Sequence, residues 1–136
     1  MPVLDTTVLV DLMRPRASEA HRRAIAFVDS ARSNGKVIST TRINVAELLV
    51  GVELADDRLE ELQRVQDVLE EMTILDLDQR ATQRFGYITA RLQRLGRPAG
   101  DLDVLIASVA LANGQSLVTR NTRHFTEIPG LQLESY

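Results

Sequence analysis

The feature of this sequence that most constrains its fold is an alternation of short apolar runs with longer segments of helical periodicity. The apolar runs have the length of short buried strands and occupy residues 2–4, 36–39, 73–77 and 116–119, with a shorter fifth run at 131–133. Between them, apolar residues recur at intervals of three and four, which indicates amphipathic helices. Strands that alternate with helices form a mostly parallel sheet covered on both faces. We therefore predict an α/β fold with three layers, α/β/α, around a sheet of four to five strands.

Residues that commonly begin helices mark the helical segments. Helices are predicted at residues 18–33, after Thr40 or Thr41, from Asp57, from Asp78, and at residues 101–113. Asp57, with Glu60 three residues later, resembles a capping box. Asp101 begins its helical run and is the natural cap there. A strand order of 3-2-1-4-5 would place the switch point of the sheet, where such folds bind ligands, between strands one and four.

Composition narrows the classes of function. The chain has 136 residues, 44% of them apolar and 26% charged, which is typical of a soluble domain. The absence of cysteine excludes disulfides, thiolate zinc sites and cysteine nucleophiles. No apolar run has the length of a membrane span and no secretory signal precedes Asp5, so we expect a cytoplasmic protein without membrane contact. The net charge of −3 does not favour a bulk polyanion binder, but 15 of the 16 basic residues are Arg, which suits phosphate oxygens. Asp11 and Glu53 are interpreted as charges on helix surfaces.

Four polar side chains far apart in the sequence are predicted to meet at the carboxyl edge of the sheet. Asp5 ends the first strand, and Glu47 lies in the second turn of the helix after the second strand. Asp103 lies in the first turn of the helix before the fourth strand, and Asn121 follows that strand. Carboxylates gathered in one place repel each other unless a cation neutralises them. Oxygen ligands of this kind suit Mg²⁺ or Mn²⁺, which also bind the phosphate oxygens of a substrate.

Each of these acids has a structural alternative. Asp5 could cap the helix that follows it, and Glu47 could form a surface salt bridge. Asp101 and Asp103 compete for one role, because residues two apart on a helix do not share a face. Asp103 lies in an apolar stretch, where an acid needs a partner or a metal. We therefore prefer Asp103 as the ligand and keep Asp101 in reserve.

The segments that carry these side chains together resemble the PIN-domain ribonucleases, and most closely the VapC-type toxins of prokaryotic toxin–antitoxin pairs. The resemblance rests on residues 3–8, 39–48, 103–107, 117–125 and 128–131. It covers essentially the whole chain and implies a single PIN domain over residues 1–136. It also implies an endoribonuclease that depends on Mg²⁺ or Mn²⁺, forms a homodimer and is held inactive by a cognate VapB-like antitoxin.

Roles for individual residues follow from the same resemblance. It implies that the metal ligands are Asp5, Glu47 and Asp103. The implied catalytic group consists of these acids and Asn121, which stands where many members of the family have a fourth acid. The resemblance and the nearby Arg side chains together imply RNA contacts by Thr7, Thr119 and Arg120. With one negative charge fewer at position 121, we expect one well-bound metal ion and a second that the substrate recruits.

Two alternatives for the function differ in class. A phosphatase of the haloacid-dehalogenase type also has an Asp at the end of its first strand. That family needs a second acid two residues later, and Thr7 occupies this position. A PIN-like module could instead bind an antitoxin or RNA without cutting it, although the presence of all three acids argues against this.

Overall fold

The fold is built on a five-stranded sheet in which every neighbouring pair of strands is parallel. The computed structural model describes residues 1–136. The strands are β1 (Val3–Leu4), β2 (Ser39–Thr41), β3 (Thr73–Leu75), β4 (Leu117–Val118) and β5 (Leu133–Glu134). Their order is β3-β2-β1-β4-β5, which confirms the predicted order and places the switch point between β1 and β4.

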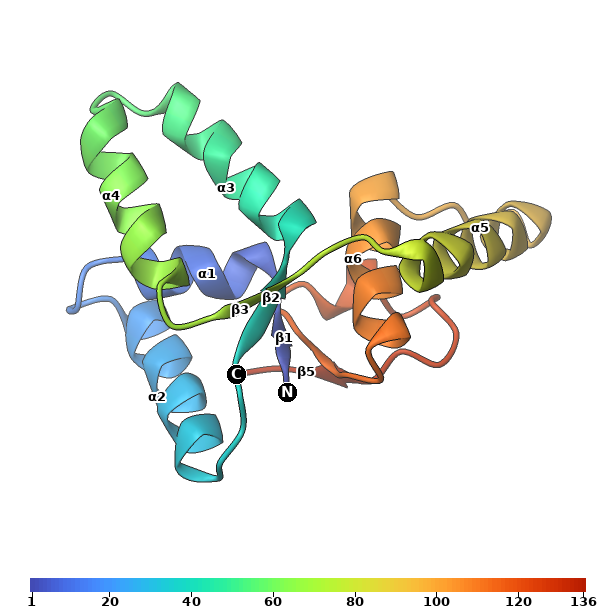
Figure 1. Cartoon of the computed structure of the whole chain (residues 1–136), viewed down its shortest axis with the longest axis horizontal. Coiled ribbons are helices and arrows are strands. Elements are labelled where there is room, and N and C mark those ends of the chain that lie inside the picture. Colours follow the sequence, from blue (N-terminus) through green and yellow to red (C-terminus); the bar gives the residue numbers. More distant parts are fainter.

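Helices cover both faces of this sheet, as Figure 1 shows with the sheet near the centre. They are α1 (Thr6–Met13), α2 (Glu19–Ser33), α3 (Arg42–Leu54), α4 (Arg58–Leu69), α5 (Gln79–Arg94) and α6 (Asp101–Ala112). A 3-10 turn at Thr122–His124 follows β4. The three-layer α/β/α prediction is thus confirmed. No helix combines the length and apolar character that crossing a membrane requires.

Two apolar clusters hold the layers together. Leu4 and Val118 pack with residues of α1 to α4, whereas Val3 and Leu117 pack with residues of α5 and α6. Successive side chains of a strand point to opposite faces, so β1 and β4 each supply one residue to each cluster. The apolar runs that form β1 and β4 therefore lie at the centre of the core.

The helix ends agree with the sequence except in α6. Asp57 and Asp78 accept hydrogen bonds from the third backbone N–H of α4 and α5, as predicted for caps. At the start of α3, Thr41 and Asn44 form a reciprocal capping box. The predicted cap at Asp101 is wrong: α6 begins after Gly100, and no side chain caps it. Asp101 instead lies within the first turn, exposed.

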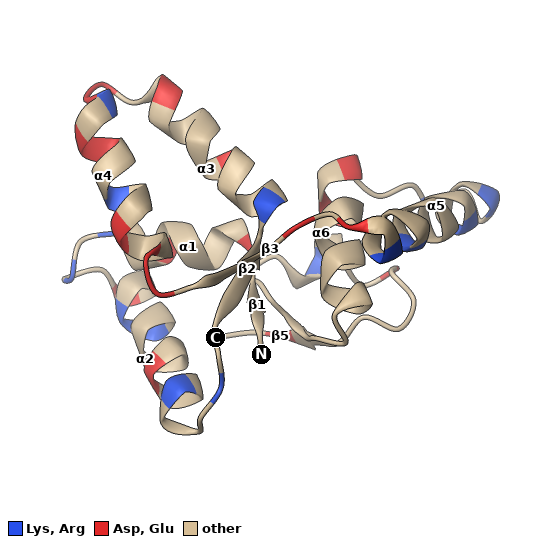
Figure 2. Ribbon diagram, in the orientation of Figure 1, with Lys and Arg blue, Asp and Glu red and all other residues tan.

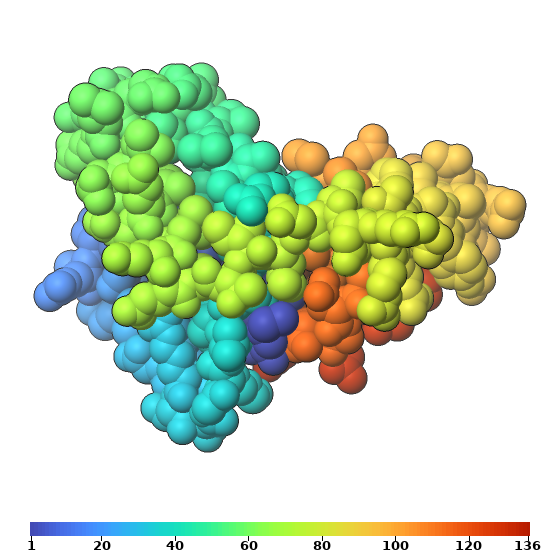
Figure 3. Space-filling view, viewed as in Figure 1, coloured from blue at the N-terminus to red at the C-terminus, as the bar shows by residue number.

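The arm formed by α3 and α4 projects from the body of the molecule, as the green region of the space-filling view shows (Figure 3). Strands of two or three residues are much shorter than helices of 12 or 13 residues, so the far halves of α3 and α4 extend beyond the sheet. Leu49 of α3 and Leu59 of α4 lie on the apolar faces that helical spacing predicts to be buried. Because these parts of the helices extend beyond the sheet, the two residues are 41% and 73% exposed.

Charge is distributed unevenly over this framework. Helix α5 carries four arginines and no acidic residue, visible as blue without red along that helix (Figure 2). The acidic residues that outnumber the basic ones in the whole chain therefore lie on the other elements. Several of them lie around the carboxyl edge of β1 and β4.

Candidate active site

A cleft of about 520 Å³ opens at the carboxyl edge of β1 and β4, where the switch point predicts a ligand site. Asp5 follows β1 and Asn121 follows β4, and these two strands pair directly. Glu47 comes from α3 and Asp103 from α6. The cleft is lined by these four and by Thr6, Thr7, Val10, Gly100, Asp101, Leu102, Arg120 and His124. The structure thus brings together all four side chains that the sequence assigned to one edge.

Asp5 is the most buried of the cleft acids, with 6% of the residue exposed. Its Oδ1 accepts a hydrogen bond from Asn44 Nδ2 at 3.2 Å, and its Oδ2 accepts one from Thr119 Oγ1 at 2.8 Å. The Thr7 hydroxyl lies 3.5 Å from the same Oδ2. Asp5 occupies the N-cap position of α1, but its side chain makes no capping hydrogen bond, so the helix-cap alternative is wrong. Neutral donors hold this carboxylate in place.

Glu47 faces Asp5 from the second turn of α3. Its Oε1 accepts a hydrogen bond from Thr6 Oγ1 at 2.7 Å, and it forms no salt bridge, so the surface salt-bridge alternative is wrong. Burial raises the pKa of the Glu47 carboxyl, the Thr6 hydrogen bond opposes this, and repulsion from Asp5 and Asp103 adds to the rise. The carboxylate is therefore more basic than an exposed glutamate.

Asp103 completes the acidic group from the first turn of α6. Burial raises the pKa of its carboxyl, the nearby His124 ring lowers it, and repulsion from Asp5 raises it further. His124 Nδ1 lies 3.4 Å from Asp103 Oδ2. Asp101 also lines the cleft but is exposed. Asp103 is thus the less exposed of the two competing acids, and its pKa responds to Asp5.

The three residues predicted to contact RNA differ in their access to the cleft. Thr119 is completely buried, donates to Asp5 and accepts a hydrogen bond from the Asn121 backbone N–H at 3.0 Å. The Thr7 hydroxyl accepts from the Arg120 backbone N–H, also at 3.0 Å. Thr7 and Arg120 line the cleft, whereas Thr119 supports Asp5 from behind.

Sequence reasoning missed Asn44 and misread Asp11. Asn44 is fully buried: its Oδ1 accepts from the Thr41 hydroxyl, while its Nδ2 donates to Asp5 and to Thr6 Oγ1. The capping signature of Thr41 with Asn44 three residues later was the signal that could have found it.

Asp11 is also fully buried, so its interpretation as a surface charge is wrong. Glu53, by contrast, forms an exposed ion pair with Arg58, as expected of a surface charge.

The donor atoms fit a hard divalent cation in part. Asp5, Glu47 and Asp103 present carboxylate oxygens to one cleft, and only the His124 ring approaches them as a partner that can carry positive charge. No three acidic or histidine side chains come close enough together to form a complete ligand group for a metal ion. Mg²⁺ is usually held by one or two carboxylates, with water and substrate phosphates as the other ligands. An incomplete set of protein ligands is therefore compatible with this ion.

A parallel sheet with an acidic cleft at its switch point defines an α/β protein with a ligand site at the carboxyl edge of its sheet. The PIN domain family model matches residues 3–131, and the chain therefore belongs to the PIN-domain family. Its relatives include VapC proteins. It is 38% identical over 96 residues to a tRNA(fMet)-specific endonuclease VapC of Salmonella typhimurium, across 69% of this chain and 71% of that one.

Two further comparisons span nearly the full length. The chain is 28% identical over 134 residues to Ribonuclease VapC2 of Haemophilus influenzae, across 98% of this chain and 96% of that protein. It superposes with a TM-score of 0.86 and 26% identity on a chain in the crystal structure of VapBC2 from Rickettsia felis bound to a DNA fragment from their promoter. That match covers 99% of this chain and 98% of the other. The recognition of a VapC-type PIN domain from the sequence is confirmed.

Proposed function

We propose that this protein is a Mg²⁺- or Mn²⁺-dependent endoribonuclease that acts as the toxin of a type II toxin–antitoxin pair. The observation that carries the proposal is the convergence of Asp5, Glu47 and Asp103 on one cleft, where burial raises the pKa of Glu47 and Asp103 and repulsion between the acids adds to the rise. Such mutual repulsion is relieved when a cation binds. The VapC relatives named ribonucleases and tRNA(fMet)-specific endonucleases support RNA as the substrate.

Asp5 and Asp103 would hold the metal ion directly, and Glu47 would bind it through water. When bound, such an ion supplies a Lewis acid that lowers the pKa of water and stabilises negative charge on phosphate oxygens. Because position 121 carries Asn in place of an acid, one ion would be well bound and the substrate would recruit a second.

The protein side chains have separate tasks in this proposal. Asn44 and Thr119 hold the Asp5 carboxylate in one orientation through its two oxygens. Thr6 binds Oε1 of Glu47, which leaves Oε2 to accept a proton from the attacking water. The raised pKa of Glu47 makes that oxygen a better base. Asn121 and Arg120 would position a phosphate oxygen at the mouth of the cleft.

The proposal extends to partners and to location. Crystal structures of VapBC assemblies that superpose on this chain support a VapB-like antitoxin as its inhibitor. We also propose a homodimer that acts on RNA in the cytoplasm. The phosphatase alternative is not favoured, because the Thr7 side chain at the position of the required second acid is engaged with the Arg120 backbone.

Two substitutions on α3 give a matched test of the site. Glu47→Gln removes a cleft carboxylate, whereas Glu53→Gln removes an exposed one that pairs with Arg58. We expect Glu47→Gln to reduce Mg²⁺-dependent RNA cleavage by about 100-fold or more, in the range of losing a general base, and Glu53→Gln to leave it unchanged. Mn²⁺ affinity, measured by calorimetry, should fall only in the first variant. Equal cleavage and equal Mn²⁺ affinity in the two variants would contradict the proposal.

A further inference from the structure

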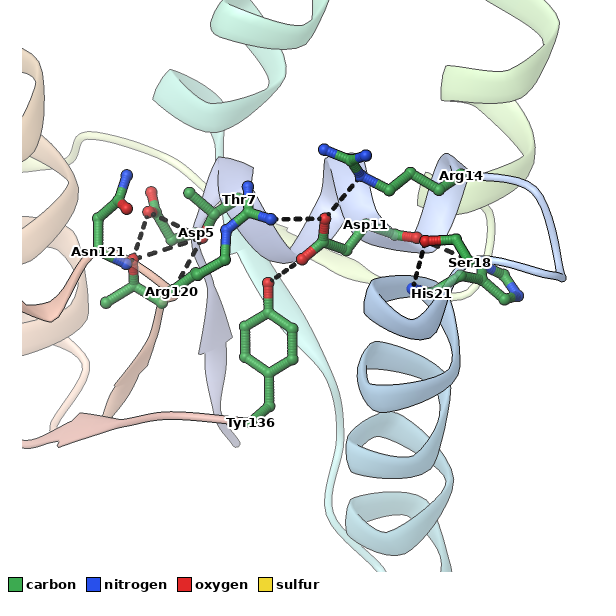
Figure 4. A network of polar contacts seen from close by, with 10 residues as sticks. Asp5, Thr7, Asp11, Arg14, Ser18, His21, Arg120, Asn121 and Tyr136 are labelled. Carbon is green, nitrogen blue, oxygen red and sulfur yellow. Dashed lines mark hydrogen bonds and ion pairs between the residues drawn. The ribbon is translucent and has the colours of Figure 1, made fainter.

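Asp11 is a fully buried carboxylate on α1 that the proposed reaction does not use. Figure 4 shows it between three donors: Arg14, three residues further along the chain, and Arg120 and Tyr136, which come from distant parts of the sequence. Its Oδ1 accepts from Arg14 Nε at 2.9 Å and from an Arg120 terminal nitrogen at 3.1 Å. Its Oδ2 accepts from the hydroxyl of Tyr136, which follows β5. A buried charge that satisfies three donors fixes the positions of the groups that bind it.

Arg120 is the partner through which Asp11 reaches the cleft. It is the only Lys or Arg among the cleft-lining residues, which also include the acids Asp5, Glu47 and Asp103. Its backbone N–H is held by Thr7 and one guanidinium nitrogen by Asp11, so both ends of the residue are anchored. The guanidinium has five N–H donors, and Asp11 engages one nitrogen only. With 42% of the Arg120 side chain exposed, the remaining donors are available to a ligand.

We propose that Asp11 is a positioning residue that holds the Arg120 guanidinium at the mouth of the acidic cleft, where its free N–H groups bind a phosphate of the RNA. The inference rests on the proposed function, because it assigns the phosphate to the RNA substrate. Without Asp11, Arg120 could turn toward the cleft carboxylates and neutralise the site that a metal ion would occupy. Arg suits this double role since its planar fork can bind a carboxylate and a phosphate at the same time.

Tyr136 secures the second oxygen of Asp11. Its ring packs against the apolar cluster of α1 to α4. Burial raises the pKa of the Tyr136 hydroxyl, and the hydrogen bond to Asp11 adds to this, so the phenol stays protonated as a donor. Both carboxylate oxygens of Asp11 therefore accept hydrogen bonds, which hold the side chain in one orientation toward Arg120.

Arg14 provides a matched control for Arg120. Both arginines bind Oδ1 of Asp11, and their side chains are 45% and 42% exposed. Arg14, however, lies outside the acidic cleft and lines a neighbouring hollow that shares Thr6, Val10 and Glu47 with it. If a phosphate binds Arg120, the two arginines should differ in their effect on RNA although they make the same contact with Asp11.

The test measures kcat and KM for Mg²⁺-dependent cleavage of a labelled tRNA at several salt concentrations. We expect Arg120→Ala to raise KM by about tenfold, as for the loss of one hydrogen bond to a charged group, and to change kcat little. The dependence of log kcat/KM on log salt should become shallower by about 0.7 to 0.9, the range for one phosphate contact with a single strand or a duplex. Arg14→Ala should leave KM within about twofold.

A double-substitution cycle tests whether Asp11 acts through Arg120. Asp11→Asn keeps the shape of the side chain, and we expect it to raise KM and reduce the salt slope as Arg120→Ala does. In a chain that already carries Arg120→Ala, Asp11→Asn should cause no further change, because positions that act through each other are not additive. Independent effects of the two substitutions, or an equal rise of KM in Arg14→Ala, would overturn the inference.

Arg120→Lys keeps the experiment decisive if Asp11→Asn fails to fold. Lysine can pair with Asp11, but its compact ammonium lacks the second arm of the guanidinium. KM should therefore remain raised as in Arg120→Ala, and a return to the native KM would overturn the inference. If the native chain cleaves no RNA, the proposed function itself fails, and that result is distinct from a cleaving enzyme in which Asp11 and Arg120 act independently.

Discussion

Replacing Asn44 by Asp would place a second carboxyl against Asp5 at nearly unchanged shape. The Asn44 amide nitrogen lies 3.2 Å from Asp5 Oδ1, and the Asn44 carbonyl oxygen accepts from Thr41, a role that an aspartate oxygen can keep. In the protonated form, the new carboxyl can still donate to Asp5. In the ionised form it faces a like charge at about 4 Å, which at an effective dielectric constant of about 20 costs roughly 4 kcal/mol.

The sign of the pH dependence follows from this repulsion. The folded protein raises the pKa of the new carboxyl above its unfolded value of about 3.9. Below that pH both states are protonated, so the substitution costs little. As pH rises, the unfolded state ionises first, and the destabilisation grows by about 1.4 kcal/mol per pH unit up to the folded pKa. We expect the free energy of unfolding to fall by about 4 kcal/mol at pH 7.5 and by less than about 1 kcal/mol at pH 4.

Urea denaturation of the native chain and Asn44→Asp in chelator, at both pH values, measures this difference. Asn44→Ala is the control: it removes the capping box and the hydrogen bond to Asp5 but adds no charge. The free energy of unfolding of Asn44→Ala should be about 1–3 kcal/mol lower than that of the native chain at either pH. An Asn44→Asp loss of the same size at pH 4 and pH 7.5 would refute the reasoning that Asn44 holds an ionised Asp5.

Three further predictions concern single side chains. Burial and repulsion raise the pKa of Glu47, so this carboxylate destabilises the metal-free fold increasingly as pH rises, and urea denaturation of Glu47→Gln should show a gain in stability at pH 7.5 that is absent at pH 4. Asp101→Ala should change the free energy of unfolding by less than about 0.5 kcal/mol, since Asp101 makes no capping hydrogen bond; a loss near 1 kcal/mol would restore its role as a cap. Asp57→Ala removes the cap of α4 and should cost about 1 kcal/mol with unchanged RNA cleavage, and thermal melts with a cleavage assay check both parts.

The fold was predictable because its strands are short apolar runs separated by amphipathic helices. The second strand shows the limit of this signal. It was expected at residues 36–39, yet it occupies Ser39–Thr41. The Ser39 and Thr40 hydroxyls donate to the backbone carbonyls of Pro2 and Leu4, which allows these polar side chains to be buried. Apolar patterning does not detect a strand whose polar groups find partners in a neighbouring strand.

The residues of the cleft were predictable in part for a similar reason. Asp5, Glu47 and Asp103 are placed by the ends of regular elements, so their convergence follows from topology. Asp11 was misread because its partners Arg120 and Tyr136 lie more than 100 residues away in sequence. The burial of a charge depends on such distant donors, and helical periodicity contains no information about them.

RNA cleavage by the purified chain, with Mg²⁺ and with excess chelator, tests the central claim most directly. Asp5→Asn, confirmed as folded by its circular dichroism, is measured beside the native chain, and each reaction is repeated with a VapB-like partner encoded next to the gene. We predict that the native chain cleaves RNA only with Mg²⁺ and that the partner suppresses this cleavage, while Asp5→Asn is inactive throughout. Cleavage that survives the chelator, or an Asp5→Asn variant as active as the native chain, would contradict the account.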